Sequence, residues 1–438
     1  MQLQIPLRPI DRLIRPFQEF MRLQAASGIL LLLTTIIAIL WANLAPHNYR
    51  EVFESHVAFS FGRVEISKTL LHWINDGLMS IFFFIVGLEI KREIMDGQLA
   101  SLRQAALPIA GAIGGMLVPA AIYASLNADG PGANGWGIPM ATDIAFAVGI
   151  LSLLGSRIPS GLKVFLTALA IADDIGAVLV IAVFYTETVS LAYLGAGGLI
   201  LLLSIAANVL KIRQPIVYFF LGIVVWMLFL KSGVHATISA ILMAFTIPVR
   251  TRLNVGLFKE NATSLLALLN PQSRPFLEEQ NHHVIQTIEA SCEAVTPPAQ
   301  RMEHGLHAIV AFLIMPIFAL ANAGVEIRFA DLQSMLFDRI SIGVILGLFL
   351  GKPLGIFLFG WICVKVGLGK LPAGVSFGGV FGTSMIAGIG FTMSLFIAGL
   401  ALAGPSQLEI AKSGILIGSL ISGIVGFAFL RFHLREPA

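Results

Sequence analysis

The sequence is poor in charged residues. Only 12% of its 438 residues are Asp, Glu, Lys or Arg, whereas a soluble globular domain has roughly 25%. Hydrophobic residues make up 57% of the chain, and apolar runs of about 20 residues, enough to cross a bilayer as helix, recur from end to end. The composition excludes an ordinary soluble protein. Because the runs are continuous and do not alternate, they indicate membrane-spanning helices and not barrel strands.

Other absences narrow the function. The two cysteines, Cys292 and Cys363, lack the spacing of a zinc site or a CxxC pair, so neither a structural metal nor a disulfide framework is expected. The net charge is +3, but the basic residues are scattered singly and form no stripe for a nucleic acid. The segment GLFLGKP, at 347–353, has the wrong spacing for a phosphate loop. We expect no cofactor, no nucleic acid and no ATP-driven reaction.

Twelve membrane spans are predicted. An even number places both termini on one side, and most of the 28 Lys and Arg residues fall on that side, which marks it as cytoplasmic. No convincing cleavage site follows the basic N-terminus, so we expect a retained first helix. The whole chain, 1–438, is predicted to be one transmembrane domain of a bacterial inner membrane. The spans lie at about 24–43, 70–90, 105–126, 138–156, 163–185, 191–209, 215–230, 233–248, 305–323, 340–362, 374–402 and 414–432.

Two polar excursions interrupt the spans. Residues 44–68 alternate apolar and polar positions around a turn at Gly62 and Arg63, which predicts a small external hairpin. Residues 250–301 are polar and contain four prolines, which favours a cytoplasmic loop, with or without short helices, between spans 8 and 9.

Spans 4 and 11 both contain residues that break helices. Paired interrupted helices are typical of inverted repeats that cross at a binding site near the middle of the membrane. We therefore pair spans 3–5 with spans 10–12 as inverted repeats. The breaking residues are Gly135, Gly137 and Pro139 in span 4, and Gly382, Gly388 and Gly390 in span 11.

Two adjacent acidic residues, Asp173 and Asp174, lie near the centre of span 5. A charge at this depth costs about 2.5 to 3.5 kcal/mol on insertion scales, so a retained pair indicates function. Neighbouring helical residues point about 100° apart, so the two carboxylates cannot face one cavity in the same way. We predict that one lines a site for a cation or proton while the other meets a different group.

Three further polar residues are expected to act with this pair. Thr142 and Asp143 follow the breaking residues of span 4, where a carboxylate offsets the positive N-termini of half-helices. The alternative for Asp143 is an ordinary N-cap. Lys352, near the middle of span 10, is predicted to offset negative half-helix ends and to bridge to Asp173 or Asp174, since it is too central to snorkel easily.

Ionisable residues at predicted span ends form a second candidate group. Glu303 and His307 are four residues apart and share a helix face, and His titrates near neutrality, so a pH-sensitive cluster is one interpretation. A solvated helix end is the other. For His235, at the start of span 8, a capped or packed role is the alternative. The pH-sensing candidates are Glu89, Arg92, Glu93, His235, Glu303, His304 and His307.

Seven segments together resemble the bacterial NhaA sodium/proton antiporter family over most of the chain. The architecture of inverted repeats and broken helices is a known property of that family, so the resemblance implies it as well. The segments are INDGLMSIFFFIVGLEIKREI from Ile74, PMATDIAFAVG from Pro139, ADDIGA from Ala172, SGVHAT from Ser232, EHGLHAIVAFLIMPIFALANAGV from Glu303, GKPLGI from Gly351 and GIGFTMSLFIA from Gly388.

The resemblance implies roles for the candidate residues. Asp174 would be the main ligand of the cation and proton, with Asp173 beside it and able to pair with Lys352. Thr142 and Asp143 would serve the crossing of broken helices. The hairpin would be a dimer contact, so a homodimer is expected in the lipid membrane, with Na⁺, Li⁺ and H⁺ as the transported ions. The residues implied in a pH-sensing funnel are Glu89, Glu303, His304 and His307.

Elementary electrostatics is compatible with such exchange. Removal from water disfavours a charged carboxylate and a nearby cation favours it, so Na⁺ and protons would compete for the same oxygens. Two protons exchanged per cation would make the reaction electrogenic. No metal beyond the transported Na⁺ is expected.

Two other functions use similar features. A sodium-coupled importer of an organic solute would need a roomier cavity, and no additional central Arg is present to bind an anion. An intramembrane aspartyl protease needs one carboxylate from each of two helices and a GxGD-like motif, which is absent.

Overall fold

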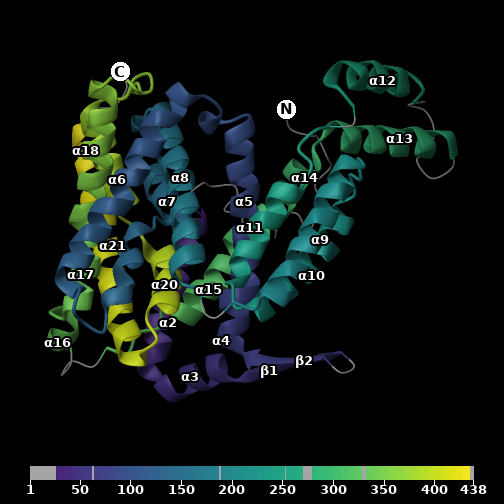
Figure 1. The fold of residues 1–438 in the computed structure, drawn as a ribbon. Helices are drawn as coiled ribbons and strands as arrows, with labels where there is room; N and C mark the ends of the chain where they lie inside the picture. Colours follow the sequence, from purple (N-terminus) through teal and green to yellow (C-terminus); the bar gives the residue numbers. More distant parts are fainter. Residues whose placement is uncertain are drawn as a thin grey trace, which may run out of the picture. The chain divides into compact units, whose positions relative to one another are not determined.

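The computed structural model describes residues 26–61, 64–186, 189–251, 253–269, 279–327 and 332–434 (Figure 1). Its contacts divide the chain into two compact units, one within 1–82, 93–187 and 309–438 and the other within 83–92 and 188–308. Apart from one pair of strands, the secondary structure of these described residues is helical. The expected all-α membrane fold is confirmed.

The first unit contains both broken spans. Its elements are α2 (Ala26–Leu44), α3 (Pro46–Glu54), β1 (His56–Phe61), β2 (Val64–Thr69), α4 (Leu70–His72), η1 (Trp73–Leu78), the ends of α5 (Met79–Met95), η2 (Gln98–Ala100), α6 (Leu102–Asn127), η3 (Ala133–Met140), α7 (Ile144–Leu153), η4 (Gly155–Arg157), α8 (Ser160–Phe184), η5 (Val310–Ile314), α15 (Met315–Asn322), α16 (Leu332–Leu336), α17 (Arg339–Leu346), η6 (Gly347–Gly351), α18 (Lys352–Lys365), α19 (Phe377–Ala387), α20 (Phe391–Ala401) and α21 (Pro405–His433).

The second unit has residues 83–92 of α5 at its centre. A small apolar core joins Leu88 of α5 to Tyr218, Met243 and Ala299. Its other elements are α9 (Leu191–Val209), α10 (Pro215–Ser232), α11 (Ala236–Thr246), α12 (Val255–Ala267), α13 (Glu279–Val295) and α14 (Pro298–Ile309).

Eleven of the predicted spans have a counterpart of sufficient length among the described residues. Ten are helices long and apolar enough to cross a membrane, and the eleventh is the pair α19 and α20, bent by 48°. The predicted eighth span corresponds to α11, which has 11 residues and a length of about 16 Å at 1.5 Å per residue, against a hydrocarbon core of about 30 Å. The count of twelve therefore stays a prediction.

The sequence explains why α11 is short. Gly233 ends the preceding helix with a φ of +83°, a conformation that glycine adopts without steric cost. His235 then caps α11 by accepting a hydrogen bond from the Thr237 N–H. At the other end Pro248 has no N–H to continue the helix, and Lys91 donates to the carbonyl oxygens of Phe245 and Ile247.

Both polar excursions contain regular structure. Within 44–68, β1 and β2 form an antiparallel pair in register from His56 opposite Thr69 to Phe61 opposite Val64; the turn at 62–63 lies outside the described residues. Within 250–301 the chain forms α12 and α13, where a loop with or without short helices was predicted. On which side of the membrane each lies stays a prediction.

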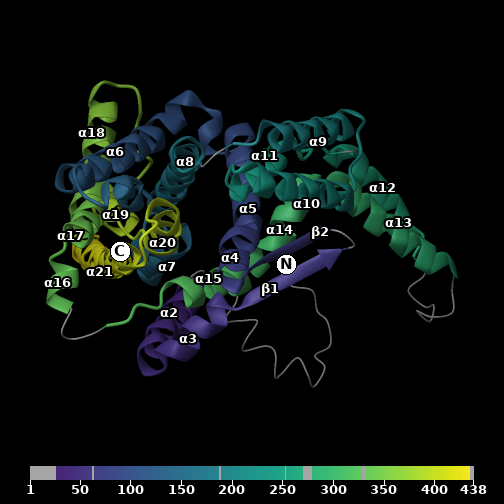
Figure 2. The same cartoon turned by 60° about the horizontal axis from the view of Figure 1, so that its bottom comes forward.

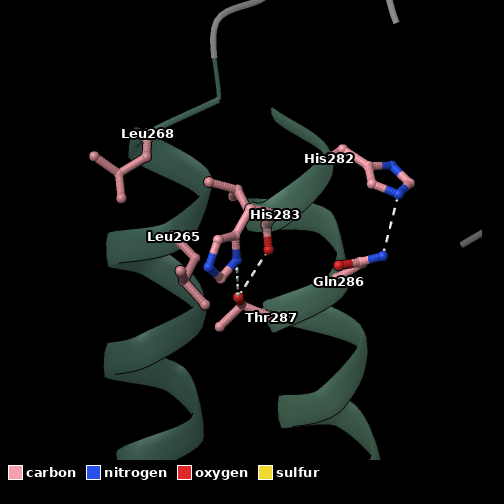
Figure 3. A pocket seen from close by; sticks show the side chains of 7 residues that line it. Leu265, Leu268, His282, His283, Gln286 and Thr287 are labelled. Atoms are coloured by element: carbon pink, nitrogen blue, oxygen red, sulfur yellow. Dashed lines mark hydrogen bonds between the residues drawn. The ribbon is translucent and has the colours of Figure 1, made fainter. Parts of the chain in front are cut away.

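Helices α12 and α13 lie side by side (Figure 3). Leu265 of α12 and His283 of α13 line one pocket between them. His283 hydrogen-bonds Thr287 and His282 hydrogen-bonds Gln286, each within α13. Both histidines are exposed, as expected for a polar segment.

The tightest helix contact in the first unit positions the site described below. Helices α6 and α18 lie side by side (Figures 1 and 2). A Cβ atom on Gly114 would lie 2.2 Å from the Gly355 carbonyl oxygen, and one on Gly355 would lie 2.1 Å from that of Gly114. Only glycine allows this approach, which is typical of small residues at membrane helix interfaces.

We expect Gly355→Ala to lower the melting temperature in detergent. The new methyl group would collide with backbone, at a cost of about 1 to 3 kcal/mol, which exceeds the gain of about 1 kcal/mol in helix propensity. Gly399→Ala in α20 is the control, because open space surrounds that position. A Gly355→Ala protein as stable as the Gly399→Ala control would contradict this packing.

Candidate ion site at the crossing of two broken helices

The two broken spans meet at their breaks. Residues 141–143 separate η3 from α7, and 388–390 separate α19 from α20. The Asp143 N–H donates to the Ile389 carbonyl oxygen at 2.7 Å, which joins the two breaks. Close approach requires glycine here, because a Cβ atom on Gly388 would lie 2.4 Å from the Leu348 carbonyl oxygen.

The position of the first break differs from the prediction. Gly135, Gly137 and Pro139 do not interrupt the helix but form the 3₁₀ helix η3. The break follows at 141–143 and ends at Asp143, the N-cap residue of α7. In span 11 the break falls on Gly388 and Gly390 as predicted, whereas Gly382 lies inside α19.

Asp143 caps both half-helices that begin at the crossing. Its Oδ1 accepts from the Phe146 N–H of α7 at 2.9 Å. Its Oδ2 accepts from the Thr392 N–H of α20 at 3.2 Å and from the Thr392 hydroxyl. The carboxylate is buried, so its charge faces the positive ends of two helices with little screening. The two interpretations of Asp143, N-cap and charge compensation, are therefore one interaction.

Lys352 occupies the opposite electrostatic position. Its side chain is 1% exposed, and its ammonium donates to Asp173 Oδ2 at 2.5 Å and to the Met140 carbonyl oxygen. Met140 is the last residue of η3, so the ammonium offsets the negative end of that helix. At the end of α19 the Ala387 carbonyl oxygen faces the Thr142 hydroxyl at 3.0 Å instead.

The two acidic residues of α8 lie beside this ammonium. Asp173 and Asp174 are 2% and 1% exposed. Asp173 Oδ2 also accepts from the Thr142 hydroxyl at 2.7 Å, whereas Oδ1 accepts no hydrogen bond from the described residues. Asp174 interacts electrostatically with Lys352. The structure thus brings Thr142, Asp173, Asp174 and Lys352 into one cluster, with Asp143 at the adjacent half-helix ends.

These groups are suited to bind a small hard cation. Carboxylate, hydroxyl and unwound backbone oxygens are the ligands found at such sites in broken-helix transporters. No group of three or more His, Cys, Asp or Glu side chains suited to a resident metal occurs in the described parts of the chain. Carboxylate oxygens of this kind can bind either a cation or a proton.

Two of the pH-sensing candidates form an ion pair. In the second unit Arg92 pairs with Glu303, which is buried. His304 and His307 are exposed on the same helix, and His304 contacts the Gln300 carbonyl oxygen.

The remaining three candidates lie on α5 and at the start of α11. Glu89 is half-buried on α5. In the first unit Glu93 accepts from the Gln98 N–H at 2.8 Å. His235 is the N-cap of α11.

A family model described as "Na+/H+ antiporter 1" matches residues 18–430. The chain is 50% identical to the Na⁺/H⁺ antiporter NhaA of Oleidesulfovibrio alaskensis, over 98% of this chain and 97% of that protein. It is 48% identical to the NhaA of Koribacter versatilis, over 96% of this chain and 92% of that protein. It is 44% identical to NhaA 1 of Saccharophagus degradans, over 97% of this chain and 92% of that protein. The chain belongs to the NhaA sodium/proton antiporter family. The resemblance seen in seven segments is confirmed.

Two residues of this NhaA-family site escaped the sequence analysis. Thr392 bonds Asp143 through both its N–H and its hydroxyl, and the Ser394 hydroxyl donates to the Ile138 carbonyl oxygen of η3 at 2.7 Å. Both follow the glycine break in GIGFTMSLFIA. Their hydroxyl groups, which follow a glycine break in an apolar span, could have identified both residues from the sequence.

We expect Lys352→Ala to lower stability as well as transport. Removing one partner of a buried ion pair costs about 3 to 5 kcal/mol, because the other charge is left uncompensated. Lys352→Arg should retain more stability since it keeps the charge. Melting curves in detergent measure both, with the exposed Lys370→Ala as control. A Lys352→Ala variant with the melting temperature of the wild type would mean that the ion pair does not stabilise the fold.

Proposed function

We propose that this protein extrudes Na⁺, and also Li⁺, in electrogenic exchange for protons, with Asp173 and Asp174 as the exchanging groups. Family membership supports Na⁺/H⁺ exchange. The observation that carries the proposal is the buried cluster in which Asp173 bonds both Lys352 and Thr142 beside Asp174.

Charge balance supplies the coupling. In the dry site each added positive charge is costly unless another leaves. Na⁺ would enter among Asp173 Oδ1, the Asp174 carboxylate and the Thr142 hydroxyl, and one proton would leave from each of the two aspartates. Lys352 would offset the charge of Asp173 after its proton has left and before the cation binds. Proton loss and cation binding are then two alternative states of one site.

The proposed stoichiometry of two protons per Na⁺ moves one net charge per cycle. The membrane potential then contributes about 2.3 kcal/mol per 100 mV for that charge. With protons moving inward, this would drive Na⁺ out of the cell. The proposed orientation, with both termini in the cytoplasm of a bacterial inner membrane, is supported by the distribution of Lys and Arg.

Assembly as a homodimer is part of the proposal. The sheet of β1 and β2 has two edges without a further strand in the described chain. Such edges are ready to pair with another chain, which supports a contact between the hairpins of two copies.

We expect Asp173→Asn and Asp174→Asn each to abolish Na⁺-driven proton movement and to leave a folded, inserted protein, because each replaces a titrating carboxyl with an amide of nearly the same volume. Asp173→Asn should in addition lower the melting temperature, because it leaves Lys352 without its buried partner. The assay is the collapse of a pH gradient in everted vesicles on addition of Na⁺, Li⁺ or K⁺ in turn. Asp129→Asn, at an exposed position, is the matched control. Wild-type exchange in either site variant would refute the assignment.

We expect Glu303→Ala and His307→Ala to shift the pH at which exchange begins and to leave the maximal rate unchanged. Glu303→Ala removes the buried partner of Arg92, and His307 lies four residues further along the same helix. The pH profile of the vesicle assay measures this, with Glu293→Ala, from the exposed pair with Arg301, as control. Unchanged pH profiles in both variants would mean that these residues do not set the pH dependence of exchange.

A further inference from the structure

An apolar groove of about 690 Å³ lies on the first unit between α2, α7 and α21, with the break between α19 and α20 at its base. Its walls include Ile29 and Ile36 of α2, Phe146 of α7 and Leu420 of α21, and its base is formed by Ile389 and Phe391. The volume lies within the range of about 300 to 1,000 Å³ found for binding sites of small molecules.

The two side-chain hydroxyls of the wall are already used within the protein. The Thr35 hydroxyl donates to the Leu31 carbonyl oxygen at 2.6 Å. Ser419 Oγ accepts from the Phe391 N–H at 3.1 Å. The remaining side chains of the wall are apolar. An occupant therefore finds hydrocarbon contacts and no group that would select a polar ligand.

The length of the groove matches one leaflet of a bilayer. Its α2 wall runs from residue 28 to 39 and its α21 wall from 416 to 428, or about 16 to 18 Å at a rise of 1.5 Å per residue. One leaflet contributes about half of the hydrocarbon thickness of about 30 Å. The rim residues Leu420 and Ile424 are exposed, which for a membrane span means that they face lipid.

We propose that this groove binds one acyl chain of a membrane phospholipid, held against the broken helix of span 11. The chemistry of the wall, its length and its opening to the bilayer all fit a hydrocarbon chain. The occupant would contact residues that also form the crossing of the two broken helices. Phe391 packs on Phe146 at 5.4 Å between ring centres, and the Ile389 carbonyl oxygen accepts the Asp143 N–H. Lipid tails would then support the helix break at 388–390.

The wild-type protein tests this in liposomes that contain a trace of phospholipid with a photoreactive diazirine midway along one acyl chain. Cross-linked peptides are mapped by mass spectrometry while unlabelled phospholipid with the same headgroup and chain length competes. We expect the labelling of α2, α7 and α21 at the groove to saturate as the mole fraction of the photoreactive phospholipid rises. It should saturate at a lower mole fraction than the labelling of Leu199 and Leu202, which are exposed apolar residues of α9.

A matched pair of substitutions separates the groove from ordinary lipid contact. Ile36 lines the groove and is 46% exposed, whereas Ile37 is 53% exposed and is not part of the wall. We expect Ile36→Trp to fill the groove and lose the saturable label, and Ile37→Trp to keep it. If Ile36→Trp does not insert, the saturation measured in the wild type still decides.

Two results would overturn the proposal. Groove label that rises in proportion to the α9 label would mean unspecific lipid contact only. A groove that takes up no label while Leu199 and Leu202 are labelled would mean that lipid does not enter it. Labelling is measured without an ion gradient, so its outcome is independent of whether the protein exchanges Na⁺ for protons.

Discussion

The candidate ion site depends on one buried ammonium group. Lys352 joins Asp173 of α8 to the last carbonyl group of η3, and so links the helix that carries both acidic residues to the first broken span. A buried charge of either sign alone would be costly. The pair makes the two acidic residues tolerable inside an apolar helix bundle, and it leaves Asp173 Oδ1 available to a cation.

A second carboxylate completes the electrostatics of the crossing. Asp143 binds the N-terminal ends of α7 and α20, whereas Lys352 binds the C-terminal end of η3. Negative and positive side chains thus meet helix ends of opposite sign. The glycines at 388 and 390 contribute by allowing the two breaks to touch, and the Gly114–Gly355 contact holds α18, and with it Lys352, close to α6.

Much of this arrangement could be predicted from the sequence, for local reasons. Apolar length located eleven spans, and charges inside those spans identified Asp173, Asp174 and Lys352, because charges are rare there. The exact break in span 4 could not be predicted, since Gly and Pro are compatible with both extended backbone and the 3₁₀ helix that forms. Thr392 was missed because a hydroxyl in a membrane helix commonly bonds its own backbone. Only tertiary structure brings it to Asp143.

The central claim is that Na⁺ and protons compete for the Asp173 and Asp174 oxygens. The most direct measurement is Na⁺ titration of the purified protein by calorimetry, at several pH values and in buffers with different ionisation enthalpies, which counts the protons released per Na⁺ bound. The account predicts proton release on binding, weaker Na⁺ affinity as the pH falls, and loss of both in Asp174→Asn. Na⁺ binding that releases no protons at any pH would contradict it.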